Sequence, residues 1–342
     1  MLNFIFGRAA TGKTYEIMQR LKKDVEDGKD VVLLVPEQFS FESEREVLLT
    51  LGDNSSTLVN VLNFTRMCDE VNRLAGGNAF SVMSECDKII SMRTALKAVK
   101  DELVIWKKYC NSPRFAKVML SAIDELKASS IKTEDLFLAN APSALGVKLS
   151  DLYKIYSTYD AMIHNRFIDP ADKLTHLYNK LSQFRYFEGK EVYIDSFKEF
   201  SGQQYKILEQ IFSQCNNVTV SLLSNGDFSD KPDNFLCLKK LYFRLKNIAK
   251  KFGVKIGEEK ILKDSRYNSK ELAILEKVLA GESLNHEYKT EDITIFNASW
   301  IYGEADFVMR TIRRLSREQG YRFRDFVVIA RDFKTYEKAI VN

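Results

Sequence analysis

The sequence predicts an α/β fold with a parallel sheet that a long all-helical segment interrupts. Short apolar runs alternate with helical patterns near both ends of the chain, and strand signals vanish from residue 84 to about residue 187. Alternating strands and helices are typical of a parallel sheet, and an insertion of about 100 residues far exceeds the dozen that an ordinary crossover needs. We therefore expect a separate helical subdomain within the α/β domain.

The first fourteen residues, MLNFIFGRAATGKT, read as a buried strand that runs directly into a glycine loop. From Gly7 to Thr14 they satisfy the phosphate-loop pattern G-x-x-x-x-G-K-[ST], and the following residues have a helical pattern. Glycines let backbone N–H groups face phosphate oxygens, and the helix start adds its dipole. We expect Lys13 to reach the β- and γ-phosphates and Thr14 to bind Mg²⁺. The predicted nucleotide-binding residues of this loop are Gly7, Arg8, Ala9, Ala10, Thr11, Gly12, Lys13 and Thr14.

The next elements continue the alternation that predicts the sheet. They are a helix at 15–27 closed by Gly28, a strand at 30–35, a helix around 41–51, a strand at 57–62 and a helix that ends at Gly76 and Gly77. The apolar run at 30–35 has no polar alternation, which indicates a strand buried on both faces. Strand, helix and strand in this order form a β-α-β unit.

The insertion has apolar residues at intervals of three and four, as helices do. The segment from Ser84 resembles an N-cap box, Pro113 suits a first helical turn, and residues 149–163 carry an amphipathic stripe. Aromatic residues at helical spacing are more often core than base-stacking platforms. We accordingly interpret three aromatic residues of the stripe as packing: Tyr153, Tyr156 and Tyr159.

Glu125 and Lys127 form an E-x-K pair on an amphipathic helix of the insertion. A nuclease centre would also need an aspartate carried by a strand, and none accompanies this pair. We therefore interpret both side chains as part of a solvated helix face and expect no nuclease site in this chain.

The sheet is expected to resume at 191–195, where an apolar strand ends in Asp195. An aspartate at the carboxyl end of a parallel strand lies near a phosphate loop at the same edge, where it can hold Mg²⁺ opposite Thr14. The later elements are expected to be a helix at 203–213, a strand at 218–223, a basic helix at 236–252, a strand at 293–298, a helix at 302–317 and a strand at 326–330. The last three look like the start of a second α/β domain.

These patterns predict four segments. They are a first part of the α/β domain at 1–75, the helical insertion at 76–187, a second part of the α/β domain at 188–285 and an incomplete second α/β domain at 286–342. A chain of 342 residues with 45% hydrophobic content can bury the cores that two or three domains require.

Charge and cysteine usage limit the class of protein. The formal net charge is only +4, so any nucleic-acid surface must come from local clusters such as the basic runs at 239–255 and 310–324. The five cysteines and three histidines are scattered without metal-ligand spacing, which favours reduced thiols, a cytoplasmic setting and no structural metal. No apolar run approaches the ~20 residues of a membrane span, so we expect no membrane partner.

The order and spacing of these motifs resemble UvrD-like helicases and, more closely, the N-terminal part of the AddB family, the B subunits of ATP-dependent helicase/deoxyribonucleases. GRAATGKT at 7–14 resembles the first motif of that family, and VPEQFSFESER at 35–45 is the most family-specific stretch. NVLNFTRM at 60–67 resembles a DNA-contacting motif, and VYIDSFKEFSGQQ at 192–204 resembles the second motif. The resemblance covers the whole chain.

The resemblance implies a RecA-like phosphate-loop NTPase fold that binds ATP and Mg²⁺, with Asp195 and Gln204 completing the site. It further implies that Arg331, in FVVIARD at 326–332, faces the nucleotide from the second domain. The DNA-binding positions that it implies, at the carboxyl edge of the sheet, are Phe39, Asn63, Phe64 and Thr65.

For the whole protein, the resemblance implies single- and double-stranded DNA as partners, repair of double-strand breaks and recombination, and a heterodimer with a helicase/nuclease A subunit. It also implies a C-terminal nuclease domain with an iron–sulfur cluster, and nothing in these 342 residues supplies either.

Ser196 departs from the family pattern, because active relatives have glutamate there to orient or deprotonate the attacking water. Losing a positioned general base costs about 10²- to 10⁴-fold in rate, so we expect ATP to bind with little or no hydrolysis. Two other classes stay open: a phosphate-loop kinase for nucleotides or small molecules, and a DNA-binding scaffold that keeps the loop as a relic. A nucleotide-binding titration separates the scaffold from the others.

Overall fold

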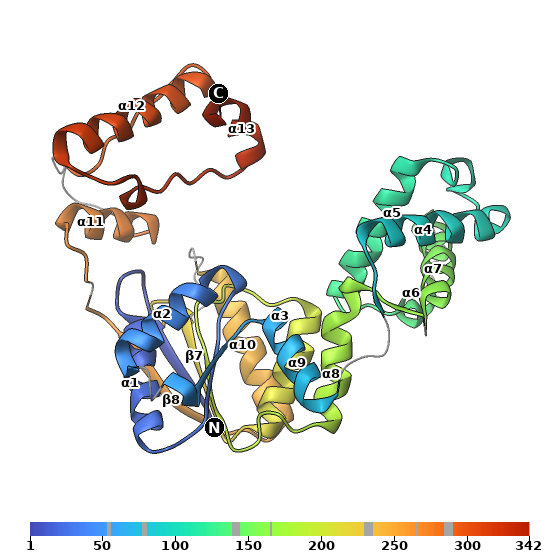
Figure 1. Ribbon diagram of the computed structural model, residues 1–342, viewed down its shortest axis with the longest axis horizontal. Helices are drawn as coiled ribbons and strands as arrows, with labels where there is room; N and C mark the ends of the chain where they lie inside the picture. The colour runs from blue at the N-terminus through green and yellow to red at the C-terminus, as the bar shows by residue number, and fades with distance from the viewer. Residues whose placement is uncertain are drawn as a thin grey trace. The chain divides into compact units, whose positions relative to one another are not determined.

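The chain forms two compact units in a computed structural model (Figure 1). The structure describes residues 1–52, 56–76, 81–138, 144–164, 166–228, 235–264, 266–283 and 290–341. Unit 1 comprises Met1–Arg266 and unit 2 comprises Tyr267–Asn342. The four segments expected from the sequence, with boundaries near 75, 187 and 285, stay predictions.

A six-stranded parallel sheet forms the centre of unit 1, which confirms the expected α/β class. Its strands, in spatial order, are β3 (Val59–Leu62), β2 (Val31–Leu34), β6 (Glu191–Ile194), β7 (Asn217–Leu223), β1 (Leu2–Gly7) and β8 (Ile256–Leu262). Every pairing between them is parallel. Because all strands run the same way, their carboxyl ends gather at one edge of the sheet.

Helices cover both faces of this sheet, as Figure 1 shows. They are α1 (Lys13–Glu26), α2 (Ser40–Leu51), α3 (Phe64–Ala75), α8 (Lys173–Gln183), α9 (Gly202–Gln214) and α10 (Leu236–Lys251), with the short helices η1 (Glu37–Phe39) and η2 (Ser56–Leu58). On one face, Leu21 of α1 shares a core cluster with Ile5 and Leu33. On the other, Tyr242 of α10 packs its ring 4.9 Å from that of Phe4.

Strand β8 is a strand that the sequence did not predict. Its segment IGEEKIL is mostly exposed, and charged residues break its apolar alternation. It pairs only with β1 and closes one edge of the sheet. Charged, exposed strands are common at sheet edges because they discourage pairing with other chains.

The helical subdomain contains α4 (Glu85–Val99), α5 (Pro113–Ala128), α6 (Thr133–Leu138) and α7 (Ala144–Ile163). The expected starts are confirmed, since Ser84 caps α4 in a capping box and Pro113 opens α5. The packing interpretation of the tyrosine stripe is also confirmed: Tyr156 and Tyr159 are buried, and Tyr153 packs against the same core. The shorter elements of this region are η3 (Lys100–Glu102), η4 (Lys107–Tyr109), η5 (Pro170–Asp172) and a parallel pair of two-residue strands, β4 (Ser81–Val82) and β5 (Phe167–Ile168).

The interpretation of Glu125 and Lys127 as a solvated helix face is right for one residue and wrong for the other. Glu125 is exposed, whereas the Lys127 side chain is only 2% exposed and forms ion pairs with carboxylates from other elements. Position on the helix decides this difference, because Lys127 falls on the same face as the buried residues Leu120 and Ile123.

Unit 2 contains α11 (Lys270–Leu279), α12 (Ile301–Gln319), η6 (Phe323–Asp325) and α13 (Phe333–Val341). The strands expected at 293–298 and 326–330 are not formed, and Ile295 and Ile329 are 93% and 87% exposed. A strand needs a neighbour for its backbone hydrogen bonds, and the described residues of unit 2 form no sheet. None of the described helices is long and apolar enough to span a bilayer.

Candidate nucleotide-binding site

The candidate site begins where β1 passes into α1 at the carboxyl edge of the sheet. Gly12 is the N-cap of α1 and has a φ of 84°, and Ala10 also has a positive φ, at 57°. Gly12 adopts this conformation without the steric cost that a Cβ would bring. Because Gly12 has no side chain to cap α1, the first N–H groups and the positive end of the helix dipole are left for an anion.

Lys13 folds back over the loop. Its Nζ atom donates a hydrogen bond to the carbonyl oxygen of Arg8, 2.9 Å away. The hydroxyl of Thr11 donates to the same carbonyl oxygen at 2.9 Å. The loop is thus closed by its own side chains, and the Lys13 ammonium group lies against its backbone.

Asp195 lies directly after β6, where it meets the loop. The Thr14 hydroxyl donates to Asp195 Oδ2 at 2.8 Å, and the hydroxyl of Ser221 on β7 donates to Oδ1. Asp195 is only 4% exposed. Carboxylate and hydroxyl oxygens are hard ligands of the kind that Mg²⁺ prefers, so this pair fits a Mg²⁺ ion whose other ligands are waters and phosphate oxygens.

Three residues near the loop were not predicted from the sequence. Arg266 donates its backbone N–H to the carbonyl of Ala10 at 2.9 Å, and its guanidinium lies 4.4 Å from the centre of the Tyr15 ring. A Cβ on Gly12 would be 3.1 Å from the guanidinium carbon. Arg266 therefore places a positive charge directly on the loop, and Tyr15 holds it there by a cation–π contact. No motif of the sequence analysis marks either residue.

Glu46 on α2 is the third such residue. Its burial and then the neighbouring carboxylates of Asp195 and Glu42 raise the pKa of Glu46. The two carboxylates of Glu46 and Asp195 are therefore close enough for their charges to interact. A cation held by Asp195 would relieve the repulsion between the two carboxylates.

The remaining predicted nucleotide residues lie in other settings. Ser196 follows Asp195 with a φ of 64°, and Gln204 accepts a hydrogen bond from the Ser201 N–H at 2.8 Å as part of the capping box of α9. Arg331 belongs to unit 2, between η6 and α13. The structure thus brings the loop and Asp195 together, while it gives Gln204 a capping role.

The four candidate DNA residues follow β2 and β3 at the carboxyl edge. Asn63 is buried and caps α3, accepting from the Arg66 N–H at 2.8 Å. Phe64 is 7% exposed and packs against Phe197 and Phe200. Asn63 and Phe64 are thus interior residues that stabilise the carboxyl edge of the sheet. Phe39, which is half-buried, and Thr65, which is exposed, offer surface to a ligand.

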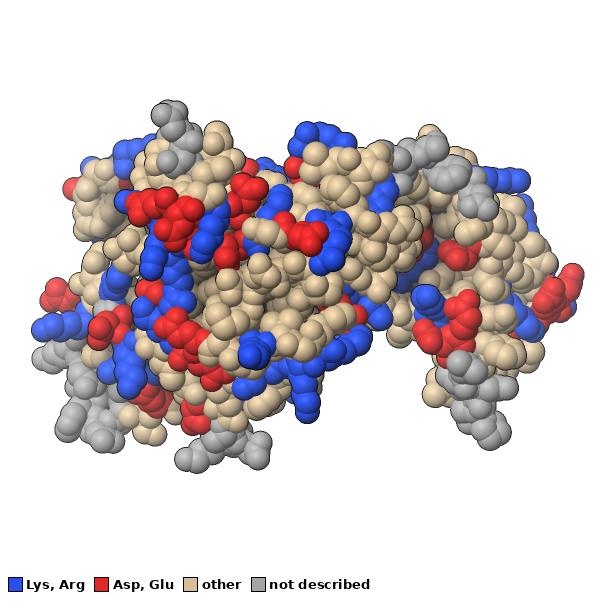
Figure 2. All heavy atoms as spheres, turned by 90° about the horizontal axis from the view of Figure 1, so that it is seen from below, with Lys and Arg blue, Asp and Glu red and all other residues tan. Residues whose placement is uncertain are grey.

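Charges of both signs are mixed on one face of the molecule. On the face drawn in Figure 2, Lys and Arg side chains are interspersed with Asp and Glu. In the basic run at 239–255, Lys239 is buried, and Lys246 pairs with Glu259 at 3.5 Å. The run is therefore partly neutralised within the fold, which agrees with the small net charge of the chain.

The fold and this edge define an α/β protein with a candidate nucleotide site formed by a glycine loop and a buried aspartate. The model of the family described as ADDB, N-terminal, matches residues 4–276, so the chain belongs to this family.

Curated relatives that are named as the B subunit of an ATP-dependent helicase/deoxyribonuclease match nearly the whole chain. The relative from Clostridium tetani is 33% identical over 356 residues, which cover 99% of this chain and 31% of the relative. The relative from Caldanaerobacter subterraneus subsp. tengcongensis is 33% identical over 99% of this chain and 30% of its own length. A relative from a Thermoanaerobacter species is 32% identical with the same coverage. The chain thus spans about a third of the length of these relatives.

Proposed function

We propose that this chain is the helicase-like N-terminal region of the B subunit of an ATP-dependent helicase/nuclease that acts in double-strand-break repair and recombination. In this proposal it binds Mg·ATP at Gly7–Thr14 and Asp195. The main support is the 2.8 Å hydrogen bond from Thr14 to Asp195, which joins residues 181 positions apart at the edge where parallel sheets bind ligands. The five free cysteines fit a cytoplasmic location.

The residues of the loop have separate roles in this proposal. The N–H groups of the loop and of the first turn of α1 bind phosphate oxygens, and Lys13 neutralises their charge. Thr14 and Asp195 hold Mg²⁺, which offsets charge on the phosphates when it is bound. Ser196 offers no base to the attacking water, so binding is expected without efficient hydrolysis. A scaffold with a relic loop would bind no nucleotide at all.

Arg266 provides a test of the site that does not depend on the loop motif. Arg266→Ala is expected to weaken Mg·ATP binding about tenfold in calorimetry, because a guanidinium next to the loop can donate charged hydrogen bonds worth about 1.5 kcal/mol to a phosphate. The matched control is Arg244→Ala. Arg244 also stacks on a tyrosine, 3.6 Å from the centre of the Tyr205 ring, but it lies on α10. Equal affinities of the two variants would contradict the placement of Arg266.

Single-stranded DNA is proposed to bind at the carboxyl edge, near Phe39, Asn63, Phe64 and Thr65, with help from the basic runs. Their position after β2 and β3 supports this part of the proposal, since both strands end at the edge that holds the candidate nucleotide site. The partner A subunit and the double-stranded substrate are proposed on the strength of the relatives' name together with the family resemblance.

The DNA proposal predicts that oligonucleotide affinity falls steeply with salt and that Thr65→Glu lowers it about tenfold. A negative charge at this exposed position would repel phosphates, and phosphate contacts dominate such binding. Fluorescence anisotropy at several salt concentrations measures both effects. Thr94→Glu, at an exposed position of α4 in the helical subdomain, is the control and should leave the affinity unchanged. Undetectable binding at low salt, or equal losses in both variants, would rule out this edge as the DNA site.

A further inference from the structure

Backbone strain in unit 1 marks a path from the candidate nucleotide site to the helical subdomain. Among the described residues, three that are not glycine have a positive φ: Ala10 in the loop, Ser196 after Asp195, and Ser130 after the end of α5, with φ values of 57°, 64° and 60°. Each such residue costs about 1 kcal/mol or more and persists only where its surroundings hold it. Strain of this kind is often concentrated at binding sites and switch regions.

The segment from Asp195 to Gln203, which we call the relay segment, connects the second of these positions to the third. Two residues anchor its middle in the core: the rings of Phe197 and Phe200 lie 4.6 Å apart and both are buried, while Lys198 and Glu199 between them are exposed. Its end is fixed by the capping box between Ser201 and Gln204. The buried rings and the capping box hold the segment to packed parts of the fold, which are not continuously deformable, so movement of Asp195 would be passed on to those anchors.

The relay segment ends against the helical subdomain. A Cβ on Gly202 would overlap the carbonyl oxygen of Ser129, so the two backbones are in direct contact at a position that requires glycine. The next residue, Gln203, is 6% exposed and donates its side-chain amide to the carbonyl of Ala171 at 2.8 Å and to the hydroxyl of Thr175 at 3.1 Å. The relay segment is thereby fastened to both the end of α5 and the turn η5.

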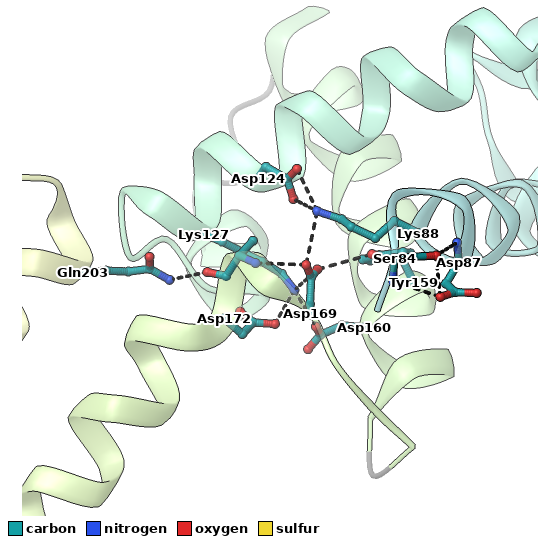
Figure 3. A network of polar contacts seen from close by, with 11 residues as sticks. Ser84, Asp87, Lys88, Asp124, Lys127, Tyr159, Asp160, Asp169, Asp172 and Gln203 are labelled. Atoms are coloured by element: carbon teal, nitrogen blue, oxygen red, sulfur yellow. Dashed lines mark hydrogen bonds and ion pairs between the residues drawn. The ribbon is translucent and has the colours of Figure 1, made fainter. Parts of the chain in front are cut away.

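An ion cluster with a buried centre, Lys127 and Asp169, lies beside this contact (Figure 3). Lys127 near the end of α5 pairs with Asp172 at 2.5 Å, Asp169 at 3.0 Å and Asp160 at 3.4 Å. Lys88 of α4 pairs with Asp124 at 2.7 Å and Asp169 at 3.1 Å. Four carboxylates therefore share two ammonium groups, and the charges on α4, α5, α7 and η5 balance best in one arrangement of these elements.

A cavity of about 730 Å³ borders the same junction. Lys127, Asp160, Asp172 and Gln203 line it together with residues of α6, α8 and α9. The subdomain and the α/β domain are thus not packed against each other on this side. The cavity leaves room for the subdomain to shift when the relay segment moves.

From these contacts we propose that the helical subdomain senses occupancy of the nucleotide site through the relay segment, with Gln203 as the positioning residue that fastens the two parts together. The inference rests on the proposed nucleotide binding and describes how that same site is coupled to the rest of the molecule. Binding of Mg·ATP at Thr14 and Asp195 changes the electrostatic force on Asp195, which is the first residue of the relay segment. Its far end moves Ser129 and Ala171, and the ion cluster transmits that movement to α4, α5 and α7. Coupling of this kind is reciprocal, so a change in the junction also alters nucleotide affinity.

Hydrogen exchange of the full chain with and without Mg·ATP tests the proposal. In the unmodified protein, Mg·ATP is expected to change the exchange rates of amides in 127–131 and 169–175 by about fivefold or more, the range typical of coupling between sites. Gln203→Leu should lose this response while it still binds Mg·ATP. Thr175→Val, which removes only one of the two acceptors of Gln203, should lose part of it. The matched control is Gln210→Leu on the same helix, whose side-chain oxygen accepts a hydrogen bond from Gln214, and it should respond as the unmodified protein does.

The outcomes separate this inference from the proposed function. If Mg·ATP does not bind, the proposed nucleotide site is wrong and the inference falls with it. If Mg·ATP binds but the two segments do not respond, only the coupling is wrong. An undiminished response in Gln203→Leu, or an equal loss in Gln210→Leu, would also overturn the role of Gln203.

Discussion

Lys127→Met is expected to lower the free energy of unfolding by about 3–5 kcal/mol, the usual cost of removing one partner from a buried ion pair. The Lys127 side chain is 2% exposed and that of Asp169 is fully buried. Methionine fills a similar volume, so the loss would come from the carboxylates that are left without their main partner. Urea unfolding at pH 7 measures it.

The pH dependence identifies the cause of that loss. Burial alone would raise the pKa of Asp169, but the charge of Lys127 and the Ala171 N–H hold this pKa below its usual value. Asp169 thus contributes stability above the pKa of the unfolded chain, near 3.8, and the contribution is lost as the pH falls through the lower pKa of the folded state. The contribution of Asp172 to stability depends on pH in the opposite direction, because burial raises the pKa of Asp172 despite the charge of Lys127. Without Lys127 the carboxylates would take up protons at higher pH, so the deficit of the variant should shrink between pH 7 and pH 5.

Lys206→Met is the matched control for this prediction. Lys206 lines the same cavity but is exposed on α9, so its loss should cost no more than about 0.5 kcal/mol. A deficit below about 1 kcal/mol for Lys127→Met, or a deficit that grows as the pH falls, would mean that the cluster does not hold the junction together.

The burial of Lys127 could not be predicted from the sequence, because its partners lie 33 to 45 positions downstream. The periodicity of α5 does place Lys127 beside Ile123 on the inner face. A lysine on that face is interpretable only once Asp160, Asp169 and Asp172 are known to converge on it from α7 and η5. Buried lysines are rare without such partners, so the solvated interpretation was the better one for the isolated helix.

The contact between Thr14 and Asp195 could be predicted, because parallel strands bring their carboxyl ends to one edge whatever lies between them in the sequence. That rule identifies the edge of the sheet where the site forms, but it does not identify the other residues that reach this edge. Arg266 reaches the loop by following β8, which the sequence analysis missed as a charged edge strand. Ser221 left only a weak signal, because it is one of two hydroxyl residues in β7, with Thr219, and its partner became clear only from the order of β6 and β7.

The segments at 293–298 and 326–330 were predicted to be strands, and the structure forms no strand at either. Both have the apolar composition of buried strands, and the structure leaves much of each exposed outside any sheet. An apolar composition indicates that a segment is suited to a pleated, buried surface. It does not supply the neighbouring strand whose backbone must pair with it, and the described residues of unit 2 provide none.

Lys13→Ala is expected to abolish measurable Mg·ATP binding, with a loss of more than about 100-fold. Lys13 lies over the loop with its ammonium at the carbonyl of Arg8, and a triphosphate would exchange that neutral contact for charged hydrogen bonds worth about 1.5–3 kcal/mol each. Calorimetry measures the affinity. Lys23→Ala, at an exposed position near the end of the same helix, is the control and should bind as the unmodified chain does.

Hydrolysis is expected to be negligible even where binding is intact, with or without DNA. Phosphoryl transfer depends on positioning and on neutralising charge, which Lys13, Thr14 and Asp195 could provide. Ser196 lacks the carboxylate that would orient or deprotonate water, and its left-handed backbone, with φ at 64°, is a conformation that residues other than glycine rarely adopt. A phosphate-release assay on the unmodified chain tests this expectation. Robust ATPase activity stimulated by DNA would contradict the argument from Ser196, and normal ATP binding by Lys13→Ala would contradict the site itself.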